Sequence, residues 1–160
     1  MQNEKNNAGN RELSIQRLVN APRELVWKVW TSPEHIKHWW GPAGFTNTIS
    51  KMEVRPGGEW EFIMHGPDGT DFKNKHIYKE VIKPEKLVLE HVTGPKFLMT
   101  VTFEERGKQT LVSIHSLFES AEQLAEVIKV FKADVGMVQN IDRMEAYVTD
   151  LNKETTTIIH

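Results

Sequence analysis

The sequence predicts an α+β domain in which one antiparallel sheet is closed by a C-terminal helix. Three observations lead to this fold class: two short tryptophan-rich helices near the start, a series of β-like runs joined by turns, and an amphipathic last third. A chain of 160 residues is long enough for one domain that buries roughly 70% of its unfolded surface. We expect this domain to span residues 11–152, between flexible tails at 1–10 and 153–160.

The first predicted elements are a strand over residues 11–19 and two short helices within 20–42. Pro22 and Pro33 suit the first position of a helix, because the N–H group that proline lacks has no partner there. A Gly-Pro pair then ends the second helix, so the helices have roughly ten and seven residues. Four of the five tryptophans lie in this segment. The two helices must therefore pack on a large apolar surface.

The middle of the chain predicts further strands in a meander. Trp60, Phe62 and Met64 alternate with charged or polar residues, which is the period of a half-buried strand. Glycine, proline and aspartate mark short turns between the runs, whereas parallel strands would need long crossovers. We therefore expect an antiparallel sheet of six or seven strands, in which the later runs are 72–82, 87–92, 97–105 and 111–118.

The last third predicts two helices rather than one. One apolar stripe runs from Leu124 to Val138 and another from Met137 to Leu151, and on one continuous helix they would point to different sides. A break within 131–135 allows both stripes to face the protein. We expect helices at 120–131 and 134–152, the second about 18 residues long and packed on the sheet.

Composition excludes several classes of function. The net charge of −2, the pI near 6.4 and the absence of a basic stripe argue against nucleic acid and anionic membranes as partners. No run of about 18 apolar residues and no signal-peptide pattern occurs, so we expect a cytoplasmic protein without membrane insertion. The sequence has no cysteine, which excludes disulfides, thiolate catalysis and thiolate metal sites.

Few residues form a pattern typical of a metal or cofactor site. His35 and His38, next to Glu34, have the spacing of a zinc pair on a helix, but no third ligand follows at a suitable distance. A solvated helix face explains them more simply. His65 and His91 lie on strands among charged residues, where an exposed imidazole is the default. Nucleotide-binding, hydrolase and metalloprotease motifs are absent, so we expect no metal and no cofactor.

Several segments carry a resemblance to known proteins. They are Ala21-Pro22 through Trp27, Trp30-Thr31-Ser32-Pro33-Glu34, Trp39-Trp40-Gly41-Pro42, Arg55-Pro56-Gly57-Gly58, Gly66-Pro67-Asp68-Gly69, and Ile141-Asp142-Arg143-Met144 with Tyr147-Val148. In these segments the chain is similar to the bacterial homologues of the C-terminal domain of the heat-shock-protein-90 ATPase activator. The order of elements likewise resembles the helix-grip fold of the SRPBCC superfamily, which includes the birch-pollen allergen and the START lipid-transfer domains. This resemblance implies a curved sheet that grips the C-terminal helix, with a cavity for a small hydrophobic or amphipathic ligand.

Side-chain alternation indicates which residues would line such a cavity. Lysines alternate outward along 72–82, which turns Asn74, His76 and Tyr78 inward, and His115 shares a face with two leucines of 111–117. The same side chains can instead fill the core or form an internal hydrogen-bond network. The full set of expected cavity residues is Trp40, Trp60, Phe62, Met64, Asn74, His76, Tyr78, His115, Gly136, Met137 and Ile141.

Three functions are compatible with these residues. The first is a binding protein for a small hydrophobic or aromatic molecule, and the second is a cavity enzyme of hydrolase, cyclase or dehydratase type that uses His76, Tyr78 and His115 for acid–base chemistry. The third is a chaperone cofactor or protein-interaction module, and a homodimer also stays open. A cavity of several hundred cubic ångströms favours the first two, and a filled interior with a large exposed apolar patch favours the third.

Overall fold

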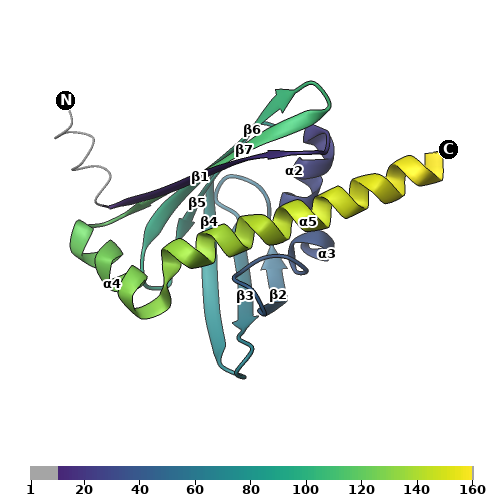
Figure 1. Cartoon of the computed structure of the whole chain (residues 1–160). Helices are drawn as coiled ribbons and strands as arrows, with labels where there is room; N and C mark the ends of the chain where they lie inside the picture. The colour runs from purple at the N-terminus through teal and green to yellow at the C-terminus, as the bar shows by residue number, and fades with distance from the viewer. Residues whose placement is uncertain (1–10, 160) are drawn as a thin grey trace.

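The computed structural model describes residues 11–159, and side chains as far as Glu154. Its seven strands form one antiparallel sheet in the order β1-β7-β6-β5-β4-β3-β2, crossed on one face by the C-terminal helix (Figure 1). The predicted α+β helix-grip architecture is confirmed. The elements are β1 (Glu12–Val19), α2 (Arg23–Thr31), α3 (Pro33–Ile36), β2 (Thr46–Met52), β3 (Glu59–His65), β4 (Asp71–Ile82), β5 (Lys86–His91), β6 (Phe97–Arg106), β7 (Gln109–Phe118), α4 (Ala121–Phe131) and α5 (Ala133–Ile159).

The predicted break between the C-terminal helices is confirmed at Lys132. This residue adopts a left-handed conformation with φ 54°, and its N–H donates to Ile128 O to close α4. At the other end of α4 the Ser120 hydroxyl accepts a 3.0 Å hydrogen bond from the Gln123 N–H, as in a capping box. The chain therefore turns between two helices. The stripe of α5 is buried at Ile141, Met144 and Val148. The other stripe is buried at Leu124 and Val127 but exposed around the turn, at Phe131, Val135 and Val138.

Two helix lengths differ from the predictions. α3 has four residues instead of about seven, because only hydrogen-bonded turns connect Ile36 to the Gly41-Pro42 stop. α5 has 27 residues and continues through most of the segment expected to be a flexible tail. Residues 137–159 contain neither glycine nor proline, so no local signal ends the helix at 152. The tail predicted at 1–10 lies outside the described residues.

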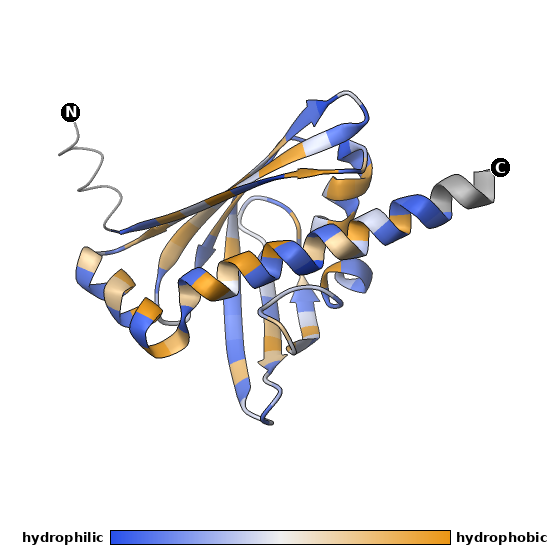
Figure 2. Cartoon of the chain, in the orientation of Figure 1, coloured by the Kyte–Doolittle hydropathy of each residue, from blue (hydrophilic) through white to orange (hydrophobic). Residues whose placement is uncertain are grey.

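The core lies between the sheet, α2 and the middle of α5. Met144 and Val148 of α5 are fully buried, as are Val26 and Val29 of α2. Figure 2 shows apolar and polar residues alternating along α5, as an amphipathic helix on a sheet requires. On the rim of this contact, the Arg17 guanidinium on β1 pairs with two carboxylates of α5, Asp142 at 2.9 Å and Glu145 at 2.5 Å.

Candidate functional site

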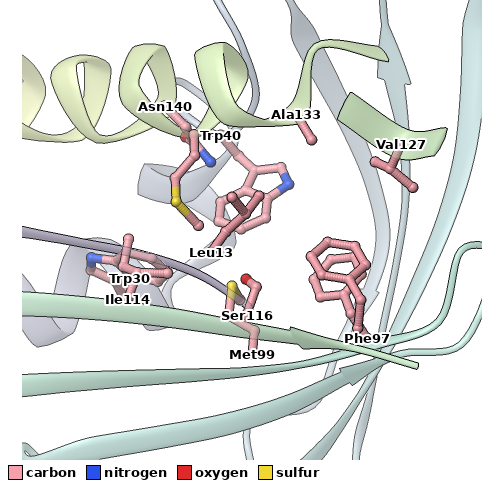
Figure 3. A pocket seen from close by; sticks show the side chains of 12 residues that line it. Leu13, Trp30, Trp40, Phe97, Met99, Ile114, Ser116, Val127, Ala133 and Asn140 are labelled. Carbon is pink, nitrogen blue, oxygen red and sulfur yellow. The ribbon is translucent and has the colours of Figure 1, made fainter. Parts of the chain in front are cut away.

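A cavity of about 170 Å³ separates the α4–α5 junction from the sheet. Its floor comes from β1, β6 and β7, one side from the tryptophan helices and the turn that follows them, and its roof from α4 and the start of α5 (Figure 3). No charged side chain lines it. The lining residues are Leu13, Trp30, Trp40, Phe97, Met99, Ile114, Ser116, Phe118, Val127, Ala133, Met137 and Asn140.

Arg143 of α5 fixes the loop that carries Trp40 into the cavity wall. Its Nη1 atom donates to the carbonyl oxygens of Trp40, Gly41 and Pro42 at 3.3, 2.9 and 2.7 Å. Its Nη2 atom donates to the carbonyls of His38 and Phe45 at 3.2 and 2.9 Å. Partial burial lowers the pKa of Arg143. One guanidinium therefore satisfies five backbone acceptors of a turn that has no regular structure of its own.

Two amides of α5 complete this clamp. The Gly41 N–H donates to Asn140 Oδ1 at 3.1 Å, and the Ala43 N–H donates to Gln139 Oε1 at the same distance. Because the oxygen of Asn140 is used by the loop, its amide nitrogen is left on the cavity side. Gln139, Asn140 and Arg143 thus couple the position of α5 to the position of Trp40.

Beside the cavity, aromatic side chains form a layer on the concave face of β3 and β4. The imidazole of His76 stacks on Trp60 and Phe62, with ring centroids 4.9 and 5.7 Å away, and the Trp40 and Trp60 rings lie 5.1 Å apart. His76 is buried, and neither ring nitrogen has a hydrogen-bond partner among the described residues. Burial, and secondarily the nearby His91, hold the pKa of His76 well below 6.5, so the ring is neutral.

His91 is buried, and the expectation of an exposed imidazole was wrong. Its Nδ1 lies 2.7 Å from Pro95 O and its Nε2 lies 2.7 Å from Asn74 Oδ1. Burial lowers the pKa of His91, and the Nδ1–H bond to the Pro95 carbonyl opposes that shift. His91 follows Leu87 and Leu89 at every second position of β5, so strand alternation predicts that it points inward. The expectation of an exposed imidazole relied instead on its charged neighbours in the sequence.

His115 was predicted to point inward, and this was wrong. It lies on the convex face of β7 and is partly exposed, with Nε2 2.5 Å from Glu12 Oε1. Both faces of this strand carry apolar residues, and the prediction followed the face with Leu111 and Leu117. The buried face is the other one, because the β-branched and aromatic residues Val112, Ile114 and Phe118 face the helices.

The remaining predicted residues divide into three groups. Trp40 and Met137 line the cavity. Gly136 packs on Pro42, where an added Cβ would lie 3.4 Å from Pro42 Cγ. The other predicted residues belong to the concave side of the molecule but do not reach the cavity; these are Trp60, Phe62, Met64, Asn74, His76, Tyr78 and Ile141.

Sequence reasoning missed most of the cavity wall. Ile114, Ser116 and Phe118 share the buried face of β7. Assigning this face of the strand to the interior would have identified all three. Phe97 and Met99 follow from the register, since β6 pairs them with Phe118 and Ser116. Leu13, Val127 and Ala133 come from elements at the two ends of the chain, and only the tertiary fold brings these together.

The acid–base residues suggested for an enzyme do not meet in this cavity. His76 is buried in the aromatic layer, and Tyr78 is buried further along β4. Burial raises the pKa of Tyr78 above its ordinary value, and His115 lies on the opposite face of the sheet. Among the described residues, no three potential metal ligands form a group, and His35 Nδ1 lies 2.7 Å from the Tyr147 hydroxyl. None of the described helices combines the length and apolar character needed to cross a membrane.

Residues 20–149 match the protein family described as activator of Hsp90 ATPase homolog 1-like. The chain belongs to this family. Its members are part of the SRPBCC superfamily, so the resemblance inferred from the motifs is confirmed. Family membership supports a ligand-binding domain or a domain like the Hsp90 ATPase activator. Comparison with curated proteins gave no match.

Solved structures of similar proteins share the fold of this Hsp90-activator-like chain. A protein from Arthrobacter aurescens is 25% identical with a TM-score of 0.84, over 89% of this chain and 88% of that one. A protein from Nitrosomonas europaea is 21% identical with a TM-score of 0.78, over 89% and 96%. An AHSA1-like protein from Aeromonas hydrophila is 21% identical with a TM-score of 0.71, over 88% and 93%.

Proposed function

We propose that this protein binds one small, largely apolar molecule in the cavity between α4, α5 and the sheet. The observation that supports this function most directly is the cavity itself, whose walls are aromatic and aliphatic and carry a few polar atoms. Pockets for small molecules have this composition. At about 170 Å³ the cavity is smaller than the pockets that hold drug-sized ligands. A dry cavity of about 150 Å³ is known to accept benzene, so the expected ligand has a single ring.

Binding of a single-ring probe tests this function. Native mass spectrometry of the purified protein shows whether a small molecule co-purifies, and an NMR titration with α-methylstyrene measures affinity. Ile114→Phe fills the cavity and should abolish binding, while a urea titration confirms that the variant folds. Leu111→Phe, on the convex face of the same strand, is the matched control and should bind as the wild type does. Equal binding by both variants would place the ligand elsewhere.

A second candidate function is a protein-interaction module, as the family name suggests. One observation favours it: four apolar side chains near the α4–α5 junction are exposed. They are Val130, Phe131, Val135 and Val138, with exposed fractions of 55, 60, 49 and 45% respectively. Stimulation of a purified Hsp90 ATPase by the protein, lost in Phe131→Ser, would support this role. An unchanged ATPase rate with the wild-type protein would exclude it.

A further inference from the structure

We propose that the cavity selects an uncharged single-ring molecule that carries one hydrogen-bond acceptor, such as an aryl ketone, aldehyde or ester. This inference rests on the proposed function and adds the chemical class of the ligand. It follows from three properties of the cavity: the absence of charge in its walls, the kind of polar atoms it presents, and its size.

The walls cannot compensate a charged ligand. None of the twelve lining residues is ionisable, and Arg17, the cation on the inner face of β1, is held by Asp142 and Glu145. The guanidinium of Arg143 is likewise directed to the carbonyls of the 38–45 loop. A carboxylate or an ammonium group would lose its hydration without gaining an ion pair, which is strongly unfavourable.

The polar atoms that face the cavity are mainly donors. The indole N–H of Trp40 can only donate, and Figure 3 shows it turned toward the space between Val127 and Phe97. The oxygen of Asn140 already accepts from the Gly41 N–H, so this side chain offers its amide N–H groups. The Ser116 hydroxyl, on the floor, points from the sheet toward α5 (Figure 3). These donors match a ligand that has an acceptor oxygen. Such a ligand should carry no donor group, because a donor would need an acceptor in the cavity wall.

The remaining walls require an apolar body of limited size. Phe97 and Val127 form the side opposite to Trp40 (Figure 3), and the Phe118 ring lies 4.9 Å from that of Phe97. Aromatic side chains at this spacing favour another ring in edge or offset contact. The volume of about 170 Å³ leaves room for one ring and a short substituent, so the acceptor must be attached directly to the ring.

Matched probes test this proposal. Acetophenone and α-methylstyrene have nearly the same shape, and differ in that a C=O group of the first is a C=CH₂ group in the second. Because their hydrophobicity differs, the informative quantity is the change that a variant causes in each Kd, as in a double-mutant cycle. Ser116→Ala should weaken acetophenone binding by about three- to tenfold and leave α-methylstyrene within about twofold. Ser113→Ala, on the convex face of β7, is the matched control.

Two further measurements complete the test. Acetophenone should move the indole N–H resonance of Trp40 further downfield than α-methylstyrene does, because only the ketone accepts a hydrogen bond from this group. The resonance is assigned by its loss in Trp40→Phe. Benzoate at neutral pH should bind at least about tenfold more weakly than acetophenone. The ligand class would be wrong if Ser116→Ala had equal effects on both neutral probes, or if benzoate bound as tightly as acetophenone. In either case the proposed binding function would still stand. Failure of all three probes to bind would overturn the proposed function, and this inference with it.

Discussion

His76 shows how a buried residue contributes to the response of the protein to acid. Its ring packs as an uncharged aromatic group against Trp60 and Phe62. Because the pKa of the folded state lies well below the ordinary 6.5, unfolding takes up a proton at this site once the pH falls below that value. The contribution of neutral His76 to stability is therefore complete above pH 6.5 and is lost as the pH falls toward the folded-state pKa.

Replacing His76 with phenylalanine should remove this part of the acid sensitivity. We expect the free energy of unfolding of His76→Phe to fall less steeply with decreasing pH than that of the wild type, by up to about 1.4 kcal/mol per pH unit for one proton. Urea unfolding between pH 5 and 8 measures the two slopes. His38→Phe, which removes an exposed histidine, is the matched control. Parallel pH profiles for wild type and His76→Phe would contradict the prediction.

At the level of elements, the contact between α5 and the 38–45 loop depends on Arg143. Arg143→Met keeps the aliphatic stem but leaves five carbonyl groups without their charged donor. We expect the free energy of unfolding to fall by about 2–3 kcal/mol, and the Trp40 indole resonance to broaden as the loop gains freedom. Arg143→Lys should rescue only part of the loss, because one ammonium group cannot reach acceptors on both sides of the loop.

The matched control for this variant is Arg106→Met, which breaks an exposed pair with Glu104 on β6. Its unfolding midpoint should stay close to that of the wild type, since exposed ion pairs contribute little. Equal losses in Arg143→Met and Arg106→Met would show that the clamp does not stabilise the loop.

The elements themselves were largely predictable, and the candidate site was not. Local signals specify turns, strand alternation and the change of stripe near Lys132, so the succession of strands along the chain and the helix break followed from the sequence. The pairing of β1 with β7 was not predicted. β7 was misassigned because both of its faces carry apolar residues, and periodicity alone cannot choose between them. The end of α5 was missed because no residue there stops a helix. The cavity wall joins β1, β7 and α4. Because β1 is far from the other two in sequence, no local sequence pattern predicts this wall.

At the scale of the whole molecule, the apolar interior is divided into two clusters with the cavity beside them. The main cluster lies under α2 and the middle of α5. The smaller one consists of Phe118, Leu124 and Val127, with partly buried neighbours that include Phe97 and Ala133. α4 therefore depends on a small cluster for its attachment, and helices with few buried contacts open before the rest of a domain.

Hydrogen exchange should consequently reveal α4 as the first unit to open. We expect its protected amides to exchange at least about tenfold faster than those of Ile141–Val148 in α5, a gap of about 1.4 kcal/mol or more. A saturating single-ring probe should slow exchange in α4 selectively, because the closed helix forms the cavity roof and the probe binds only that state. The amides of α2, which lie over the main cluster, serve as the internal reference. If α4 exchanged only together with α5 and α2, the two clusters would form one cooperative unit and the prediction would be wrong.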